Sequence, residues 1–587
     1  GVVHTAPGHG RDDFNTGRKY GLPAFCPVDE RGILTEEALE FAGISYKECD
    51  TVVVSRLREV GHLLREDDHT HSYPHSERDG KPVIFRTTEQ WFVSMDHDEL
   101  RTRMLAEIGK VSWHPKSGFN RIEAMVRTRP DWCISRQRPW GVGIPVFYGR
   151  DSKEPVLDPK AIDSVADLVA REGSDAWFEK DPSSILPAGY AHPKTGEKSF
   201  VKEVDVLDVW FDSGSTSLCV LEGEVESRWK ERWPADLYLE GSDQHRGWFN
   251  SSLVIGTAVK GGAPYKAVLT HGFVDDEHGR KMSKRLGNVL DPEAVSETHG
   301  ADVLRYWVAS VDWQNDAPCS EGLLKQFGEN YRTVRNTIRF LLGNLSDYNP
   351  AAAVAELLDL DRWIIEQTEL LVGDCVEAYA EYDFGFVVNA VHNFCAKELS
   401  RFYLDAIKDR MYCDGKDWNS RRSAQYASHF VALNITRLMA PILAHTCEEA
   451  YGRIPQSNPL ETVHAELFEA PSQERRDEIR GNELELRFAA LLSARSDVFA
   501  AFEAWKAGAE VKDSQDAIVT IATDPDTAAL LLSFGEDLPN LFKFSSVEVL
   551  AGSHSISFAK SPFAKCERSR LRRPDVAEVV WEGRKVP

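Results

Sequence analysis

The chain has 587 residues, too many for a single hydrophobic core, so we expect three to five domains. Hydrophobic residues make up 42% of it and charged residues 28%, which excludes wholesale disorder and collagen-like repetition. It contains no uninterrupted apolar run long enough to span a membrane. The first residue is Gly1, in a stretch that resembles the middle of a strand, and we expect a piece of a longer protein.

The charge is unevenly distributed. Sixty-nine basic residues stand against 93 acidic ones, a formal net charge of −24 that by itself argues against a nucleic-acid partner. Residues 100–140, however, hold nine Lys and Arg against three Asp and Glu, and residues 559–587 hold eight against four. A polyanion can bind at such basic segments, so net charge alone excludes nothing.

Ten cysteines occur singly, without a Cys-x-x-Cys pair, which is typical of reduced thiols in a cytoplasmic protein. His69, His71 and His75 lie close together, but their spacing in a turn-rich segment is a weak metal-binding pattern.

Four regions follow in chain order. Residues 1–125 mix turns with β-rich runs at 51–55 and 83–87. In the next region, residues 126–320, strands alternate with helices from 201 to 320, as in a parallel α/β sheet. Within the latter, residues 151–200 are polar and predict a surface insertion.

The period becomes helical in residues 321–470. One helical face is predicted from Val387, Val391, Phe394, Phe402 and Tyr403. A second face is predicted from Tyr426, Phe430 and Leu433. Residues 471–587 then predict a helical segment followed by strands at 517–522 and 546–550.

A polar cluster follows the strand expected at 236–240. It contains Glu240, Gly241, Asp243 and Gln244, and a helix is expected from there to about Lys260. Ligands of open α/β sheets bind at the carboxyl ends of strands, beside helix N-termini, so this cluster suits a ribose or an ammonium group. The alternative is that Asp243 merely caps the helix.

A second candidate site is the Gly-flanked loop Lys281, Met282, Ser283 and Lys284. Two lysines three residues apart can place two ammonium groups on one phosphate chain. The alternative is a basic loop that is only solvated surface.

These motifs together have a family resemblance. Residues 281–284 (KMSK) resemble the KMSKS signature of class I aminoacyl-tRNA synthetases. Residues 208–214 (DVWFDSG) and 241–249 (GSDQHRGWF) resemble the isoleucyl members specifically, as do the tract 131–140 and the helix 397–410. The likeness extends over essentially the whole chain.

The resemblance implies an α/β fold: the second half of a Rossmann-like catalytic core at 126–320, with the later part of a β-rich editing insertion at 1–125. An all-helical anticodon-binding domain at 321–470 and a small α+β tail at 471–587 would follow. It also implies ATP-dependent activation of isoleucine to isoleucyl-adenylate and transfer to tRNA(Ile), with tRNA, isoleucine and ATP as partners and the protein a monomer. No enzyme nucleophile is needed, so catalysis rests on positioning and charge stabilisation.

The resemblance also assigns roles to residues. Lys281 and Lys284 neutralise the departing pyrophosphate, with Mg²⁺ helping. Glu240, Gly241, Asp243 and Gln244 surround the adenylate ribose and the isoleucine ammonium group. Trp210 and Trp248 lie near the aliphatic side-chain pocket, with plain core packing as their alternative. The anticodon is expected to meet the helical region, including three arginines of its first helix: Arg332, Arg335 and Arg339.

An aliphatic pocket discriminates poorly against one missing methylene, worth about 1–3 kcal/mol, and this family is the standard example of that limit. Hydrolytic editing of valine compensates for it. His4 and Asp13 match editing-site positions of the family, Asp13 as the carboxylate that holds the ammonium group. The alternative is that Asp12 and Asp13 form a charge pair at a helix N-terminus.

Three departures from the family pattern stand out. No His-x-Gly-His motif is present, so we expect this chain alone to be inactive in aminoacylation. Arg285 replaces the closing Ser of KMSKS. Ser569 replaces a ligand of the family's four-cysteine zinc module, leaving Cys566 as a remnant, and one thiolate cannot form a structural zinc site.

Two other readings stay open. A valyl-tRNA synthetase is the alternative within the class, although it carries different residues in both motif stretches. A tRNA-binding or proofreading paralogue without ligase activity is the alternative outside it. The missing His-x-Gly-His motif favours the paralogue, and the intact lysine pair opposes it.

Overall fold

The structure is a computed structural model. It describes residues 3–76, 80–222, 227–283, 286–352, 356–509 and 511–566, together with 569, 571–574, 576, 579–581 and 584–586. The chain divides into two compact units, one formed by residues 1–238 and 243–269 and the other by 239–242 and 270–587. No helix in these described ranges combines the length and apolar character required to cross a membrane.

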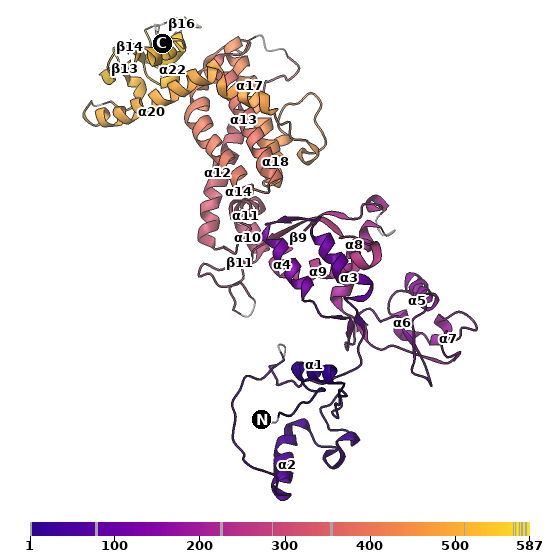
Figure 1. The fold of residues 1–587 in the computed structure, drawn as a ribbon. Helices are drawn as coiled ribbons and strands as arrows, with labels where there is room; N and C mark the ends of the chain where they lie inside the picture. The colour runs from indigo at the N-terminus through magenta and orange to yellow at the C-terminus, as the bar shows by residue number, and fades with distance from the viewer. Residues whose placement is uncertain are drawn as a thin grey trace. The chain divides into compact units, whose positions relative to one another are not determined.

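The first unit is built on a three-stranded sheet. Its order is β2 (Ser112–His114), β10 (Tyr265–His271), β9 (Ala235–Gly241), and β10 runs parallel to β2. The last residues of β9 and β10 are counted with the second unit. Four helices gather around this sheet (Figure 1): α3 (Leu100–Ile108), α4 (Ser117–Arg127), α8 (Val209–Leu221) and α9 (Trp248–Lys260). Their apolar faces form one core around Met104, Ile122 and Leu253. The parallel pairing and the helix ending at Lys260 agree with the sequence prediction.

Helix α9 is the central element of this unit, because residues 249–257 are all buried. It packs closely against α8 at Gly214, where an added Cβ would lie 2.9 Å from the backbone oxygen of Ser251. A side chain at Gly214 would therefore push α8 away from α9.

The polar segment at 151–200 folds around a core of its own. A sheet in the order β6 (Pro155–Val156), β5 (Phe147–Gly149), β7 (Phe200–Lys202) carries α5 (Pro159–Glu172), α6 (Ala176–Glu179) and α7 (Pro182–Ile185). Phe147, Val165 and Trp177 are buried within it. The expected surface insertion is thus a small folded subdomain.

The strands expected at 51–55 and 83–87 are not present. Residues 51–55 lie inside helix α2 (Tyr46–Glu59), and residues 83–87 form an irregular segment. The Ser45 side chain accepts a hydrogen bond from the Lys47 N–H and so caps α2. The residues on both sides of 51–55 within α2 also favour a helix. These effects outweigh the few tenths of a kcal/mol that each Val costs a helix.

Residues 1–125 are therefore not β-rich in their described part. They contain α1 (Arg11–Tyr20), α2, α3 and α4, a 3₁₀ turn η1 (Glu36–Phe41), and only the short strands β1 (Phe92–Val93) and β2.

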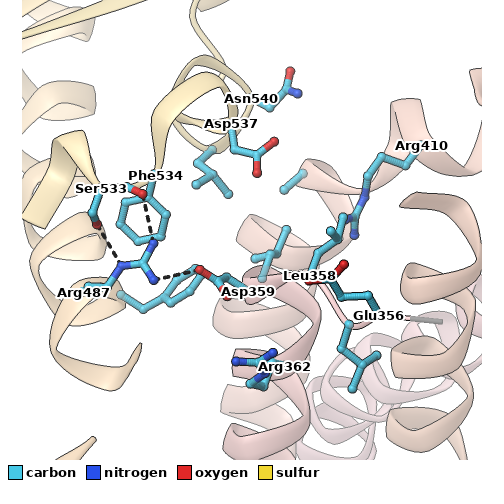
Figure 2. Close-up of a pocket in the computed structure, with 15 residues that line it drawn as sticks. Glu356, Leu358, Asp359, Arg362, Arg410, Arg487, Ser533, Phe534, Asp537 and Asn540 are labelled. Carbon is cyan, nitrogen blue, oxygen red and sulfur yellow. Dashed lines mark hydrogen bonds and ion pairs between the residues drawn. The ribbon is translucent and has the colours of Figure 1, made fainter. Parts of the chain in front are cut away.

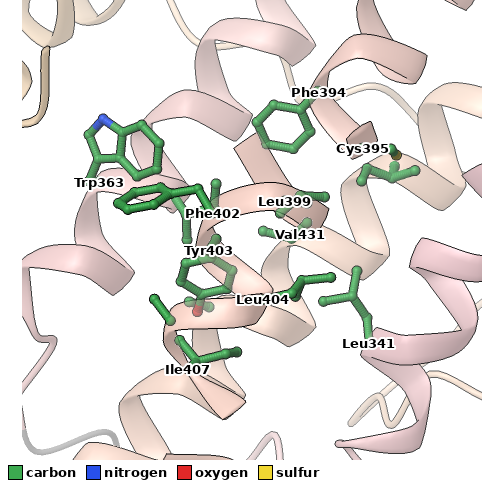
Figure 3. Close-up of a cluster of buried hydrophobic side chains, with 14 of the residues drawn as sticks. Leu341, Trp363, Phe394, Cys395, Leu399, Phe402, Tyr403, Leu404, Ile407 and Val431 are labelled. Carbon is green, nitrogen blue, oxygen red and sulfur yellow. The ribbon is translucent and has the colours of Figure 1, made fainter. Parts of the chain in front are cut away.

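The second unit begins with β11 (Val274–Asp275), which pairs in parallel with β12 (Ala317–Pro318), and with α10 (Pro292–His299) and α11 (Ala301–Ser310). A bundle follows: α12 (Glu321–Gly343), α13 (Asp359–Ala380), α14 (Phe384–Phe394), a π-helical stretch (Cys395–Tyr403), α17 (Asn419–Met439) and α18 (Ala444–Tyr451). Figure 3 shows the core of this bundle, in which Trp363, Phe402 and Tyr403 pack together. The all-helical prediction for this region is confirmed.

The first predicted face of the bundle is confirmed, since Val387, Val391, Phe394, Phe402 and Tyr403 are all buried. The second is wrong by one residue. Tyr426 is 37% exposed and Phe430 and Leu433 are only partly buried, whereas the fully buried residues of α17 include Ala427, Val431, Ala432 and Ile435. Small residues let α17 approach α13 closely, which displaces the larger side chains to the edge of the contact.

The tail contains α19 (Gln473–Gly481), α20 (Glu483–Ala509) and a sheet in the order β14 (Ser546–Ala551), β13 (Ala517–Thr523), β15 (Ser555–Lys560). β13 pairs in parallel with β14 and antiparallel with β15, and α21 (Pro525–Leu532) and α22 (Leu538–Phe542) accompany them. The helix and the two strands predicted here are confirmed.

Candidate active site and lysine loop

The turn between β9 and α9 holds the first group of predicted residues. Strand β9 ends at the buried Gly241, with Glu240 exposed just before it, and the chain continues into a 3₁₀ turn at Ser242–His245. The Gln244 Oε1 accepts a hydrogen bond from the Trp248 N–H at 2.9 Å, and the Gln244 Nε2 donates to the Asp243 Oδ2 at 3.1 Å. Asp243 is not the cap of α9, because Gly247 occupies that position. Its exposed carboxylate is therefore available to a ligand.

Trp210 and Trp248 lie close to this turn. The Trp248 indole stacks on Tyr238, and its Nε1 donates to the Ser213 carbonyl oxygen of α8 at 2.9 Å. Trp210 is 40% exposed, and a Cβ added at Gly247 would lie 2.8 Å from its ring and 2.4 Å from the Gln244 Oε1. Trp210, Gln244 and Trp248 are thus brought together at Gly247. Plain core packing does not explain a tryptophan as exposed as Trp210.

Asp208 is a structural residue of this site to which the sequence analysis assigned no role. It is 3% exposed, and its Oδ1 caps α8 by accepting from the Trp210 N–H at 3.2 Å. Its Oδ2 accepts from the Trp132 Nε1 at 3.0 Å and from the Arg136 guanidinium at 2.8 Å. Asp208 therefore ties the tract 131–140 to the helix that carries Trp210. An acidic residue directly before an apolar helical run was the available signal.

A cavity of about 460 Å³ opens beside Trp210. Burial and the nearby Asp208 charge raise the pKa of Asp212, one of its lining residues. Its charged and aromatic lining residues include Arg136, Arg138, Trp140, Asp208, Trp210 and Asp212. A cavity with aromatic walls and charges of both signs can accept a polar ligand that has an apolar part.

The lysine loop belongs to the second unit. The Lys281 Nζ lies over the Phe273 ring, 3.8 Å from its centroid, and Met282 packs against the small core around Trp307. The Ser283 N–H donates to the Asn288 Oδ1 at 2.9 Å. Lys284 and Arg285 lie outside the described residues.

Two residues that the sequence analysis gave no role hold this loop. Asp276, 7% exposed, accepts hydrogen bonds from Arg280 and Asn288. These two partners, Asn288 first, hold the pKa of Asp276 far below its usual value. Asn288 connects Asp276 to the lysine loop. The positions of Asp276 and Asn288 beside the signature gave only a weak hint of this network.

The expected editing residues lie at the start of α1. His4 is exposed, and the Asp13 Oδ2 accepts from the Ala6 N–H at 2.9 Å. Asp12 and Asp13 both occupy the first turn of α1, where a negative charge is favourable. The structure thus shows a structural role for Asp13, and its editing role remains a prediction.

Cys566 is half-buried, and its Sγ accepts from the Ser569 N–H at 3.4 Å. The described residues contain no group of three or more His, Cys, Asp or Glu side chains that could hold a metal ion. A single thiolate does not fit a structural zinc ion, so no step is assigned to zinc here.

Arg332, Arg335 and Arg339 are exposed and share one face of α12. Elsewhere in this unit, a cavity of about 300 Å³ lies between the start of α13 and the tail (Figure 2). Arg487 at its edge donates to the Asp359 Oδ2 at 2.7 Å and to the Ser533 Oγ at 2.8 Å. Arg487 therefore joins the tail to α13.

Comparisons with known proteins agree with the motifs. Residues 33–320 match the family model described as tRNA synthetases class I (I, L, M and V), and residues 361–521 match that described as the anticodon-binding domain of tRNA ligase. Curated proteins named isoleucine–tRNA ligase are 45% identical over 93% of the chain in Kosmotoga olearia, 44% over 98% in Brevibacillus brevis and 47% over 96% in Geobacillus thermodenitrificans.

The chain spans 59%, 63% and 60% of the length of these three relatives. Among solved structures, methionyl-tRNA synthetase of Mycobacterium tuberculosis in complex with methionyl-adenylate has a TM-score of 0.47 at 17% identity, covering 76% of this chain and 84% of that one. From the two family models and the long, highly similar relatives, we conclude that the chain belongs to the class I tRNA synthetases, among the relatives of isoleucine–tRNA ligase.

Proposed function

We propose that the protein containing this chain is an isoleucine–tRNA ligase. It joins isoleucine to ATP, releasing pyrophosphate, and transfers the isoleucyl group from the adenylate to the terminal ribose of tRNA(Ile). The observation that carries the proposal is the convergence of Trp210, Gln244 and Trp248 at Gly247, in the stretches that resemble the isoleucyl members of the family.

The chemistry assigned to the first group of residues follows from their exposure and charge. The exposed carboxylates of Glu240 and Asp243 can receive the ribose hydroxyls and the ammonium group of the amino acid. Trp210, which is 40% exposed, can present aromatic surface to an aliphatic side chain. Trp248 is partly buried against the core and would support the pocket from beside it. These residues bind and orient the substrate, so that its carboxylate oxygen can attack the α-phosphate of ATP.

Lys281 has the complementary role. Its ammonium group stabilises the negative charge that develops on the departing pyrophosphate, and Lys284 and Mg²⁺ brought with ATP share this role. Lys281 makes no ion pair in the described residues and contacts the Phe273 ring. A cation–π contact of this kind is worth only about 0.5–1 kcal/mol at an exposed site, so the lysine can leave it for a phosphate.

The tRNA would be held by the second unit. The exposed row Arg332, Arg335 and Arg339 on α12 suits contacts with phosphate groups. Editing of valine attached to tRNA is proposed for the region around His4 and Asp13.

Aminoacylation by the intact gene product tests the proposal. The product should attach isoleucine to tRNA(Ile). When valine is offered, valyl-tRNA(Ile) should be hydrolysed to valine and uncharged tRNA and should not accumulate. A product that binds tRNA(Ile) and hydrolyses valyl-tRNA(Ile) but charges no amino acid would instead identify a proofreading paralogue.

A further inference from the structure

The carboxylate of Asp276 has a distinct set of partners for each oxygen. The Oδ1 accepts from the backbone N–H groups of His278 at 2.9 Å and Arg280 at 3.0 Å, which closes the turn after β11. The Oδ2 accepts from the Arg280 Nε at 2.8 Å and from the Asn288 Nδ2 at 3.0 Å. The Oδ1 thus closes the local turn, and the Oδ2 binds Asn288, which follows the lysine loop in sequence.

Asn288 carries this contact to the backbone of the loop. Its Oδ1 accepts from the Ser283 N–H at 2.9 Å, and its Nδ2 also lies 3.4 Å from the Lys281 carbonyl oxygen. Asn288 therefore contacts the loop on both sides of Met282. Because an ionised carboxylate can only accept, Asp276 forces the amide NH₂ toward itself and so points the amide oxygen at Ser283.

The lysine side chain itself is held weakly. Lys281 is fixed through its backbone, by the bridge to Asp275 and by Asn288, while its ammonium group rests on the Phe273 ring. A lysine ammonium group moves on a flexible four-carbon stem, and the position of the backbone sets which points this stem can reach. A displacement of about 1 Å at a reacting centre can cost on the order of 100-fold in rate.

We propose that Asp276 is a positioning residue for adenylate formation, acting through Asn288 to hold the backbone of residues 281–283 so that Lys281 reaches the departing pyrophosphate. This inference rests on the proposed ligase function. Asp276 touches no reacting atom, and its effect passes through Lys281.

The Asp276→Asn variant separates this role from simple closure of the turn. Its remaining oxygen can still accept from the backbone N–H groups of His278 and Arg280. Its NH₂ group, however, would face both the NH₂ group of Asn288 and the Arg280 guanidinium, which loses its acceptor. Asn288 then flips or withdraws, and Ser283 loses its acceptor. In the exchanged pair D276N/N288D, the amide NH₂ at position 276 can donate to the carboxylate at position 288. The other oxygen of that carboxylate can again accept from the Ser283 N–H.

Isoleucine-dependent ATP–pyrophosphate exchange by the intact gene product measures the effect. D276N should lower kcat by about 10- to 100-fold, with KM for isoleucine changed less than about twofold. The exchanged pair should recover the part of the loss that passes through residue 288, while the Arg280 guanidinium still lacks its acceptor. In a Lys281→Ala background, D276N should have little further effect, because the group that it positions is absent. If D276N does not fold, as judged by its thermal unfolding, Asn288→Ala should show the same kcat loss and the same dependence on Lys281.

Asp347→Asn is the matched control. Asp347 is also held by arginine and amide donors, at 2.7–3.0 Å, but within the helical bundle, and its loss should leave exchange unchanged. If the wild-type protein is active in exchange and D276N has the same kcat, the positioning role of Asp276 is overturned, and the proposed function is not affected. The role is also overturned if the kcat losses of D276N and Lys281→Ala multiply in the double variant. It is likewise overturned if D276N/N288D folds but recovers none of the lost kcat. A wild-type protein without isoleucine-dependent exchange overturns the proposed function and this inference together.

Discussion

The indole of Trp248 stacks on the phenol ring of Tyr238, with ring centroids 4.0 Å apart and ring planes 13° apart. Tyr238 belongs to β9 and Trp248 begins α9, while the indole N–H reaches the Ser213 carbonyl oxygen of α8. One side chain thus connects the strand and the two helices that hold the candidate isoleucine pocket. Its shape and its hydrogen bond can be separated experimentally.

Trp248→Phe retains an aromatic ring against Tyr238 and removes the indole N–H. We expect a loss of about 1 kcal/mol in the free energy of unfolding, the usual value of one hydrogen bond, and a higher KM for isoleucine because α8 is less firmly held. Urea denaturation and exchange kinetics measure the two effects. Trp248→Ala should cost about 3 kcal/mol or more. Equal stability of the Phe variant and the wild type would show that the Ser213 contact contributes nothing.

Lys281→Ala should lower the rate of adenylate formation far more than it weakens isoleucine binding. The ammonium group is proposed to act on the leaving pyrophosphate, where charge develops only as the reaction proceeds. Single-turnover adenylation and equilibrium binding of isoleucine give the two quantities. Equal losses in both would contradict the assigned role, and Lys260→Ala, a change on the remote end of α9, is the control.

Asp361 is a fully buried charge of the helical bundle. It is 0% exposed, and it accepts from the Arg410 guanidinium at 2.6 Å, the Tyr403 hydroxyl at 2.8 Å and the Ser423 hydroxyl at 2.5 Å. Removing one partner of a buried ion pair leaves the other charge unpaired, so Asp361→Ala should lower the free energy of unfolding by about 3–5 kcal/mol. Glu449→Gln breaks the exposed pair with Arg453 and should cost less than about 1 kcal/mol. Similar losses for the two variants in urea denaturation would contradict this ranking.

Asp347 makes the stability of the bundle dependent on pH. Hydrogen bonds from Arg421, followed by Gln425, lower its pKa to about 2, against about 3.9 in an unfolded chain. A carboxylate with a lowered pKa in the folded state stabilises the protein above its unfolded pKa, and this contribution disappears as the pH falls from about 4 to 2. Asp347→Asn should therefore destabilise the protein at pH 6, and the difference from wild type should shrink at acid pH. A difference independent of pH in urea titrations would show that the charge is not responsible.

Sequence patterns correctly predicted the helices and strands in which the conformational preference of the residues agrees with their packing in the fold. Helix α9 and strand β13 have the apolar residues and the flanking turns that their structures require. Residues 51–55 have β-branched side chains but lie within a capped helix, so the flanking residues decide their conformation. The buried face of α17 was displaced by one residue because close helix packing selects small side chains over Tyr426 and Phe430.

The candidate site was predictable only where a residue belongs to a recognisable motif. Trp210, Asp243 and Lys281 were found in this way. The roles of Asp208 and Asn288 depend on contacts with residues distant in sequence or on the direction of an amide group, as in the hydrogen bond from Trp132 to Asp208. No periodicity or spacing encodes such contacts.

Amino-acid-dependent ATP–pyrophosphate exchange by the intact gene product, compared for isoleucine and valine, tests the central claim most directly. We expect exchange with both, with kcat/KM for isoleucine higher by about 100-fold, the discrimination for which this family is the standard example. Exchange that favours valine would identify a valyl enzyme, and no exchange with either amino acid would contradict a ligase.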